Sequence, residues 1–307
     1  MTKVFIDGSV GTTGLRIVER LSERSDLELL LLPDELRKDP AARADALASA
    51  DIAFLCLPDD AAKESAALAG ASRVKIIDTS TAHRTDPQWV YGMPELEGQR
   101  QRICDSARIA NPGCHASGFI ALVAPLVQKG IVAKDARLTC FSLTGYSGGG
   151  KKMIAQYENS DRPGLYDAPR QYALSQSHKH LKEMGAVCSL NSAPIFCPIV
   201  GDFYSGMEVT VPVFADQLKA GVPEIRALYQ GYYQNGLIHF DDSADEDGLL
   251  SACAYSGRDD MGISVFGNED RIILTARFDN LGKGASGAAI QNMNILLGLP
   301  EATGLTV

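Results

Sequence analysis

Short apolar runs alternate with segments of helical period along the first third of the 307-residue chain. Runs rich in aliphatic and β-branched residues predict buried strands at residues 4–7, 27–32, 52–57 and 74–78. Apolar side chains recurring every three to four positions predict helices at residues 14–21, 41–50 and 61–69. Strands alternating with helices form a parallel sheet, so we expect an α/β, Rossmann-type doubly wound domain.

The pattern changes after the helix that is predicted to follow residue 113, because strand-like runs then outnumber helical ones. Strands are predicted at residues 138–144, 193–200, 207–214, 262–266 and 271–278. This succession of strand-like runs favours a separate α+β domain with a mostly antiparallel sheet, spanning residues 114–281. A final helix at 284–297 is expected to pack on the first domain, which would then be discontinuous and comprise residues 1–113 and 282–307.

Composition narrows the class of protein. Hydrophobic residues make up 45% of the chain and charged residues 22%, as in a soluble globular protein. The net charge of -9 argues against nucleic acid as a partner, and no apolar stretch is long enough to span a bilayer. Seven cysteines without framework spacing, and a first strand that starts at the N-terminus without a signal peptide, predict a cytoplasmic protein.

One cysteine stands where a turn leads into a helix. Residues 111–118 read Asn-Pro-Gly-Cys-His-Ala-Ser-Gly, and the apolar run 119–127 that follows has helical length. Free amides and the dipole at a helix start stabilise a thiolate, so Cys114 is predicted to be a nucleophile. Free cysteine is usually a small buried hydrophobe, which is the role expected for Cys56, Cys104, Cys140, Cys188, Cys197 and Cys253.

A glycine-rich turn directly follows the first predicted strand. The pattern G-x-x-G-x-x-G at residues 8–14 opens a helix, where backbone amides bind a pyrophosphate. The candidate contacts are Gly8, Gly11, Thr12, Thr13 and Gly14, although such glycines also serve tight strand–helix packing. After the second strand, the acidic pair at 34–35 suits NAD and the basic pair Arg37 and Lys38 suits NADP, so the spacing leaves both open.

Two histidines, His178 and His180, are candidates to assist a thiolate as acid and base. They also resemble half of a zinc site, but no second pair lies nearby in the sequence and no metal is predicted. The other histidines, His83, His115 and His239, are expected to have surface or satisfied structural roles.

Two further stretches suit an anionic ligand. The glycine-rich stretch 144–152 carries lysines and lacks P-loop spacing, and 78–84 places hydroxyls and one arginine at the ligand edge of the sheet. The acidic run 241–247 lacks the features of an EF-hand and is expected to be a solvated loop.

Taken together, these stretches resemble the N-acetyl-gamma-glutamyl-phosphate reductase family in its shorter, type 2 form, and more distantly aspartate-semialdehyde dehydrogenase. The resemblance rests on residues 8–14, 78–84, 91–96, 111–118, 145–151, 178–183 and 279–287. Within the stretch 78–84, only Ser80 and Arg84 align with the longer form of the family. The resemblance therefore assigns no role to residues 81–83.

The resemblance implies NADP as cofactor, a small acyl phosphate as substrate, and a homo-oligomer, either a dimer or a tetramer. It implies Cys114 as nucleophile and one of His178 and His180 as acid and base. The implied substrate contacts are Arg84, Asn111, Ser147, Gly148, Lys151 and Glu183. Ser80, Asn280 and Gly284 join the cofactor contacts, with 282–287 closing over the nicotinamide.

Three alternatives stay open at this point. One is a reductase of another acyl phosphate, of the aspartate-semialdehyde dehydrogenase type. Another is a nonenzymatic NADP-binding regulatory module, which would need no thiol with a histidine pair. A cysteine hydrolase is the third, and it leaves the glycine turn at 8–14 without a role.

Overall fold

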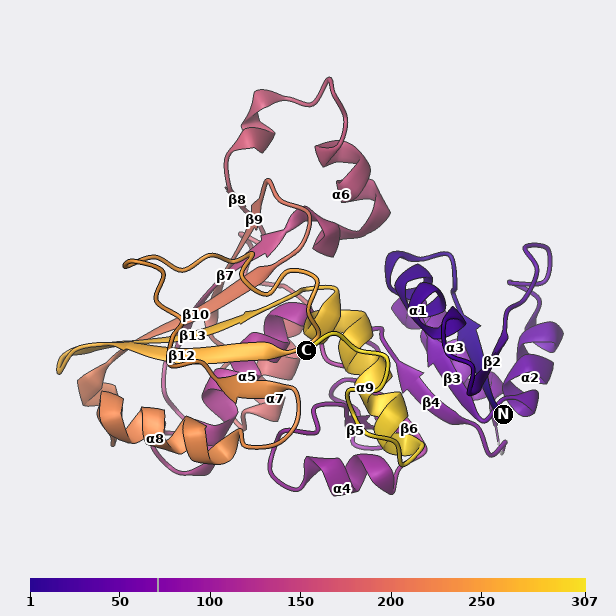
Figure 1. Cartoon of the computed structure of the whole chain (residues 1–307), viewed down its shortest axis with the longest axis horizontal. Coiled ribbons are helices and arrows are strands. Elements are labelled where there is room, and N and C mark those ends of the chain that lie inside the picture. Colours follow the sequence, from indigo (N-terminus) through magenta and orange to yellow (C-terminus); the bar gives the residue numbers. More distant parts are fainter. Residues whose placement is uncertain (71) are drawn as a thin grey trace. The chain divides into compact units, whose positions relative to one another are not determined.

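Two compact units make up the computed structural model, which describes residues 1–70 and 72–307 (Figure 1). One comprises Met1–Pro112 and Ala285–Leu305, and the other comprises Gly113–Gly284 and Thr306–Val307. Within the described residues, no helix is long and apolar enough to cross a membrane.

The first unit contains the predicted parallel sheet. Its strands lie in the order β2-β1-β3-β4-β6-β5, and every pairing is parallel. The strands are β1 (Thr2–Asp7), β2 (Leu27–Leu30), β3 (Ile52–Leu55), β4 (Lys75–Asp78), β5 (Val90–Tyr91) and β6 (Arg108–Ala110). The helices are α1 (Thr12–Ser22), α2 (Pro40–Ser49), α3 (Asp59–Leu68), α4 (Gln99–Cys104) and α9 (Gly287–Leu296). This arrangement confirms the doubly wound α/β class.

Alternation along the strands divides the core of this unit between the two faces of the sheet. Val4 and Ile6 of β1 pack with Ile290 and Met293 of α9, whereas Phe5 packs on the opposite face with residues of α2 and α3. The last long segment of the chain therefore completes the core begun by the first strand.

Local signals explain where the helices of the first unit begin. The carboxylate of Asp39 accepts a hydrogen bond from the Ala42 amide, and Pro40 occupies the first turn of α2. The pattern at 14–21 missed the first turn of α1, which begins at Thr12 directly after Gly11. Two short strands, β5 and β6, and the short helix α4 were not predicted, because so few residues carry no periodicity.

The second unit is built on a mixed sheet with the strand order β11-β12-β13-β10-β7-β9-β8. Its strands are β7 (Thr139–Gly145), β8 (Arg170–Gln171), β9 (Ile195–Gly201), β10 (Met207–Phe214), β11 (Ile238–Phe240), β12 (Met261–Gly267) and β13 (Arg271–Phe278). Antiparallel pairings predominate, whereas β7 with β9 and β11 with β12 are parallel. The predicted α+β character is therefore confirmed.

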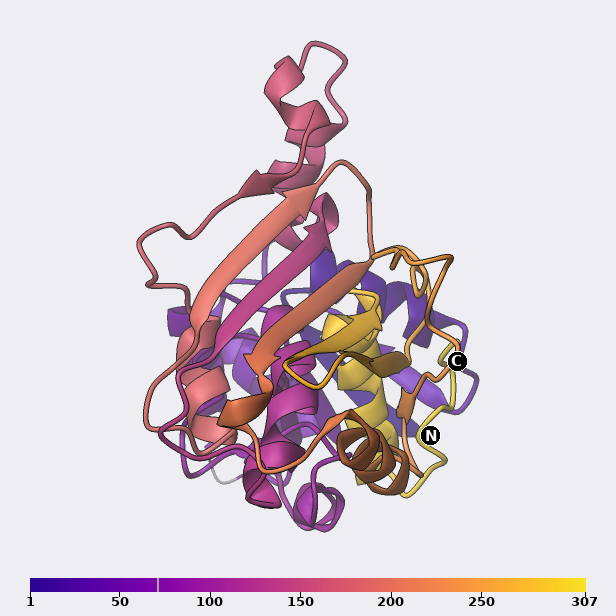
Figure 2. The same ribbon diagram turned by 90° about the vertical axis from the view of Figure 1, so that its left-hand side faces the viewer.

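Helices cover one face of this sheet. They are α5 (Cys114–Gln128), α7 (His180–Val187) and α8 (Val222–Tyr232), and α5 packs directly on β10 and β13. In Figure 2 the strands β9, β7 and β10 lie in front of α5, and the segment carrying α6 (Gly150–Tyr157) extends away from the sheet.

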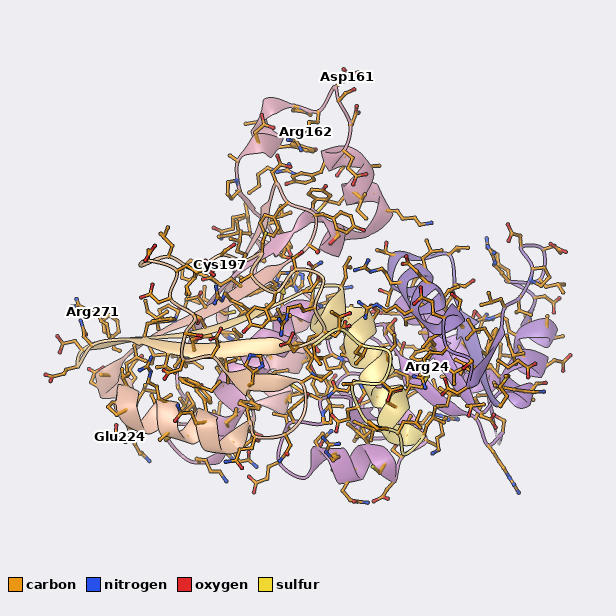
Figure 3. All side chains as sticks on the ribbon, in the orientation of Figure 1. Arg24, Asp161, Arg162, Cys197, Glu224 and Arg271 are labelled. Atoms are coloured by element: carbon orange, nitrogen blue, oxygen red, sulfur yellow. The ribbon has the colours of Figure 1, made fainter. Side chains whose placement is uncertain are left out.

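The segment that carries α6 is held by stacked arginine and tyrosine side chains, with the Arg170 guanidinium 3.7 Å from the Tyr166 ring centre. Arg162, labelled in Figure 3, also binds the carboxylate of Asp202 there.

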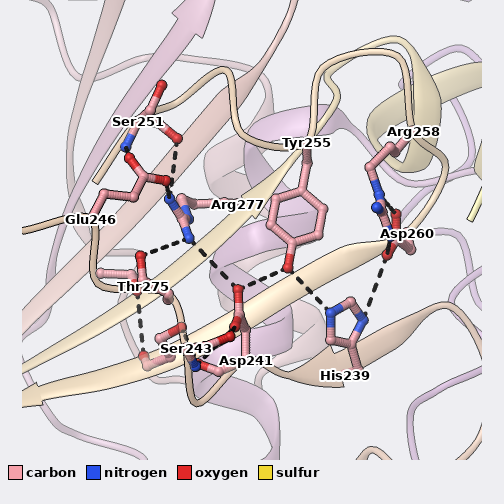
Figure 4. Close-up of polar contacts among 12 residues, drawn as sticks. His239, Asp241, Ser243, Glu246, Ser251, Tyr255, Arg258, Asp260, Thr275 and Arg277 are labelled. Carbon is pink, nitrogen blue, oxygen red and sulfur yellow. Dashed lines mark hydrogen bonds and ion pairs between the residues drawn. The ribbon is translucent and has the colours of Figure 1, made fainter. Parts of the chain in front are cut away.

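The acidic run 241–247 is more structured than the solvated loop expected from the sequence. Most of its residues are exposed, but Arg277 of β13 donates to Glu246 at 2.6 Å and lies 3.6 Å from Asp241 (Figure 4). The Tyr255 hydroxyl donates to Asp241 at 2.9 Å. A buried arginine therefore ties this loop to the sheet.

A buried ion pair at the end of β1 stabilises the first unit. The Arg43 guanidinium donates to Asp7 at 3.0 Å, and the Ser65 hydroxyl donates to the same carboxylate at 2.6 Å. We expect Asp7→Asn to lower the free energy of unfolding by about 3–5 kcal/mol, because it removes the buried carboxylate that Arg43 binds and leaves the exposed Glu64 near its charge. Glu64→Gln is the matched control, since Glu64 lies 3.7 Å from Arg43 but is exposed. It should cost less than about 1 kcal/mol in urea unfolding, and equal losses for the two variants would contradict this assignment.

Candidate active site

Cys114 is the first residue of α5, as the sequence pattern predicted. Gly113 precedes it in an extended conformation, and its carbonyl accepts the Ser117 amide at 2.8 Å, which starts the helix. The Cys114 side chain is half-buried, whereas residues 115–127 of the helix are buried throughout. The thiol therefore stands at the positive end of a helix that the core holds in place.

A π-helical turn at Gly282–Ser286 passes against Cys114. A Cβ atom placed on Gly284 would lie 3.0 Å from the Cys114 Cβ, so this close approach requires glycine. The turn is held by the buried carboxylate of Asp279, which accepts hydrogen bonds from the amides of Leu281 and Gly282. It also accepts from the Ser205 hydroxyl and the Gly257 amide, so one carboxylate joins three segments.

The two predicted histidines lie beside each other near the start of α5. Their ring centres are 4.7 Å apart, and the His180 amide donates to Nδ1 of His178 at 3.2 Å. His180 is buried and its Nε2 lies 3.9 Å from Glu183 Oε1, whereas His178 is half-buried. Glu183 is buried as well, and its Oε2 accepts the Gly113 amide at 3.2 Å. These residues thus share one site with Cys114.

His115 has the satisfied structural environment expected of it, and it reveals two residues that the sequence did not single out. The imidazole is buried, with Nδ1 2.6 Å from the Ser142 hydroxyl and Nε2 2.6 Å from the Tyr172 hydroxyl. Burial, together with the nearby His178, lowers the pKa of His115 to about 3, so the imidazole is neutral. No sequence pattern indicated Ser142 or Tyr172, because strand β7 and the segment after β8 bring them to His115.

The remaining single histidines are also bound to neighbours. His83 Nδ1 lies 2.6 Å from the Asp78 carboxylate, and its ring stacks on Trp89. His239 lies 3.2 Å from the Tyr255 hydroxyl. Both match the structural roles expected from the sequence.

The glycine turn of the first unit combines close packing with an open helix start. Gly8 has a φ of +86°, and a Cβ atom there would lie 2.3 Å from the Cys56 carbonyl oxygen. Gly14 approaches the Gly8 carbonyl oxygen equally closely, whereas Gly11 has more room. Thr12 and Thr13 begin α1, where amides of the first turn have no partner within the helix. The turn therefore fits both the packing role and a bound pyrophosphate.

Ser80, Arg84 and Asn111 have neighbours within the first unit. The Ser80 hydroxyl donates to Asp78 at 2.8 Å, and Arg84 donates to the backbone carbonyl of Asn111 at 2.9 Å. The Asn111 side chain is buried and donates to the Ala285 carbonyl at 3.0 Å. All three brace the loops at the carboxyl ends of β4 and β6.

Arg37 and Lys38 lie on the loop after β2. Arg37 forms an ion pair with Asp34, and its Nε donates to the Leu32 carbonyl at 3.4 Å. Lys38 is exposed. The loop therefore presents the Lys38 charge to solvent beside the edge strand β2, whereas the half-buried Arg37 is paired with Asp34.

In the second glycine-rich stretch, Ser147 and Asn280 are joined, whereas Lys151 lies apart from them. The Asn280 side chain donates to the Ser147 hydroxyl at 3.0 Å and accepts the Gly206 amide at 2.9 Å, and both side chains are buried. Gly148 is exposed next to Asn280, and Lys151 is exposed on α6. The contact between Ser147 and Asn280 ties the stretch to the turn beside Cys114.

The expectation of burial was wrong for two of the six other cysteines. Cys104 and Cys253 are exposed, because one ends the short surface helix α4 and the other lies in a loop. Cys140 and Cys188 are buried, and Cys56 and Cys197 are half-buried. Desolvation raises the pKa of Cys56 to about 12. Through residues 1–70 and 72–307, no group of three or more His, Cys, Asp or Glu side chains is placed to hold a metal ion.

Comparisons with known proteins agree with this architecture. The semialdehyde dehydrogenase NAD binding domain matches residues 3–105, and the semialdehyde dehydrogenase dimerisation domain matches residues 114–280. Aspartate semialdehyde dehydrogenase II from Vibrio cholerae has the same fold, with a TM-score of 0.74, 18% identity, and coverage of 97% of this chain and 98% of that one.

Two reductases are more similar to the chain in sequence than this solved structure is. The chain is 45% identical to N-acetyl-gamma-glutamyl-phosphate reductase 2 of Nostoc sp., with 99% of both chains covered. It is 47% identical to N-acetyl-gamma-glutamyl-phosphate reductase of Rhizobium meliloti, covering 96% of this chain and 98% of the relative. Identity at this level over nearly the whole length shows that the chain belongs to the N-acetyl-gamma-glutamyl-phosphate reductase family.

Proposed function

We propose that the protein reduces N-acetyl-L-glutamyl 5-phosphate to N-acetyl-L-glutamate 5-semialdehyde and phosphate, with NADPH, in arginine biosynthesis. The observation that carries the proposal is Cys114 at the start of a buried helix, beside His178, His180 and the turn at Gly284. Family membership supports the substrate, and a nonenzymatic module would have no use for this constellation.

The chemistry begins with attack of the Cys114 thiolate on the acyl phosphate carbonyl. The helix start stabilises the thiolate, and expulsion of phosphate leaves a thioester. Arg84 is our candidate for stabilising the phosphate as it leaves. When bound, NADPH supplies the hydride that reduces the thioester, and we assign its phosphates to the turn formed by Gly8, Gly11, Thr12, Thr13 and Gly14.

Of the two histidines, we propose His178 as the group that gives a proton to the thiohemiacetal oxyanion formed by hydride transfer and takes it back as the C–S bond breaks and the aldehyde leaves. It is half-buried and can reach a ligand, whereas His180 is buried. His178 accepts the His180 amide at Nδ1, which places the proton of the neutral ring on Nε2. His180 and Glu183 then act as positioning residues beside Gly113.

We propose a homodimer formed through the face of the second sheet that lies opposite α5. Phe141, Ile195, Phe214 and Ile273 are exposed there, and the strand register puts them all on the face opposite α5. Exposed apolar residues on one face of a sheet are typical of an interface, and the match to a dimerisation domain supports a second copy as occupant. Free thiols, exposed ones among them, support a reducing cytoplasm as the compartment.

We expect Cys114→Ser to abolish turnover while folding and cofactor binding persist, because almost no alkoxide forms near neutral pH. Iodoacetamide should label Cys114 before the exposed Cys104 and Cys253, as measured on each peptide by mass spectrometry. Burial and the charge of Asp279 raise the pKa of Cys253 and slow its alkylation, so the exposed Cys104 is the more stringent control. Serine-variant turnover within about tenfold of wild type, roughly 1.4 kcal/mol of barrier, would rule out a thioester.

We expect the protein to bind NADP more tightly than NAD. Arg37→Ala with Lys38→Ala should weaken NADP binding about tenfold, roughly 1.4 kcal/mol, without changing NAD binding, because only NADP carries a 2′-phosphate. Lys63→Ala removes an exposed charge from α3 and serves as the control in fluorescence titrations. Equal or tighter binding of NAD by the wild type would refute this assignment.

We expect Phe141→Asp to convert the dimer to a monomer, because it places a charge in the apolar interface. Leu165→Asp is the matched control, since Leu165 is 77% exposed on the segment beyond α6 and lies outside this face. Light scattering after size-exclusion chromatography measures the mass of each variant. A monomeric wild type, or a Phe141→Asp variant that stays dimeric, would contradict the proposed interface.

A further inference from the structure

Ser142, His115 and Tyr172 form a hydrogen-bonded network centred on the residue that follows Cys114. The Ser142 hydroxyl lies 2.6 Å from His115 Nδ1, and the Tyr172 hydroxyl lies 2.6 Å from Nε2. Ser142 comes from β7, His115 follows Cys114 in the first turn of α5, and Tyr172 lies just after β8. Three separate segments thus converge on one imidazole.

The number of hydrogen-bond donors in this network sets the direction of its two hydrogen bonds. The neutral imidazole of His115 carries one N–H and one acceptor nitrogen. Ser142 is fully buried, and through residues 1–70 and 72–307 its hydroxyl has only His115 as a partner. If His115 donated to Ser142, the serine hydrogen would be buried without an acceptor, at a cost of about 1–3 kcal/mol. Ser142 therefore donates to Nδ1, and Nε2–H donates to the Tyr172 oxygen.

With these hydrogen-bond directions, the hydroxyl hydrogen of Tyr172 is not used by His115. The oxygen of Tyr172 accepts from His115, so its own O–H is available to a third group. Burial and the charge of a Cys114 thiolate raise the pKa of the Tyr172 hydroxyl, which keeps it protonated. A protonated hydroxyl bonded to the residue next to Cys114, with its rotation restricted by His115, is a preorganised donor.

We propose that Tyr172 is a catalytic residue that donates a hydrogen bond to the oxyanion of the tetrahedral adducts on Cys114, with His115 and Ser142 as its positioning residues. As sulfur bonds to the carbonyl carbon, the carbonyl π electrons move onto oxygen, and Tyr172 binds that charge while keeping its own proton. The inference rests on the proposed thioester reaction and adds an oxyanion donor from outside α5.

Tyr172→Phe tests the proposal in the phosphate-dependent oxidation of N-acetylglutamate 5-semialdehyde, followed as NADPH formation. We expect kcat to fall about 100-fold with KM little changed, because an oxyanion donor acts in the transition state. Tyr232→Phe is the control, since its hydroxyl lies on α8 and donates to Gln128. Wild-type turnover in the same assay tests the reaction itself, so failure of the reaction and failure of the Tyr172 assignment are distinguishable.

Alkylation of Cys114 by iodoacetamide separates an oxyanion donor from a structural role. It should proceed at the wild-type rate in Tyr172→Phe, whereas a displaced helix start or a lost thiolate contact would slow it. His115→Gln, which keeps an N–H donor, should retain more kcat than His115→Met, which has none. A Tyr172→Phe kcat within about threefold of wild type, or alkylation that falls in parallel with kcat, would overturn the proposal.

Discussion

The packing of α5 against the second sheet is the constraint on which the site depends. Residues 115–127 of this helix are buried, and a Cβ atom on Gly118 would lie 2.5 Å from the Val209 side chain. Close packing leaves the helix little freedom to shift, so its first residue, Cys114, has a defined position. The proposed nucleophile thus gains its precise position from a hydrophobic core rather than from a loop.

Polar contacts then bring other segments to that fixed helix start. Asp279 holds the turn that passes Cys114, Glu183 accepts the Gly113 amide, and His115 joins β7 to Tyr172. Each of these groups is buried and bonded, so loss of one partner would leave an unsatisfied polar group as well as a displaced neighbour. The site is therefore rigid for the same reason that the core is stable.

Hydrophobic periodicity and turn residues predicted much of the fold. Strands at 207–214 and 271–278 were placed correctly, and so was the helix start at Cys114, because these signals are local. Ser142 and Tyr172 were missed, since their role arises from contacts between residues 27 and 57 positions apart in the chain. The two exposed cysteines were misjudged because burial depends on tertiary position. Residue type alone does not determine it.

Trapping the covalent intermediate tests the central claim most directly. Enzyme mixed with N-acetylglutamyl phosphate in the absence of cofactor, then quenched in acid, is digested and examined by mass spectrometry. The account predicts an N-acetylglutamyl group on the peptide that contains Cys114, and its release as the semialdehyde when NADPH is added before the quench. An unmodified Cys114 peptide under conditions that support turnover, or an acyl group on another cysteine, would contradict it.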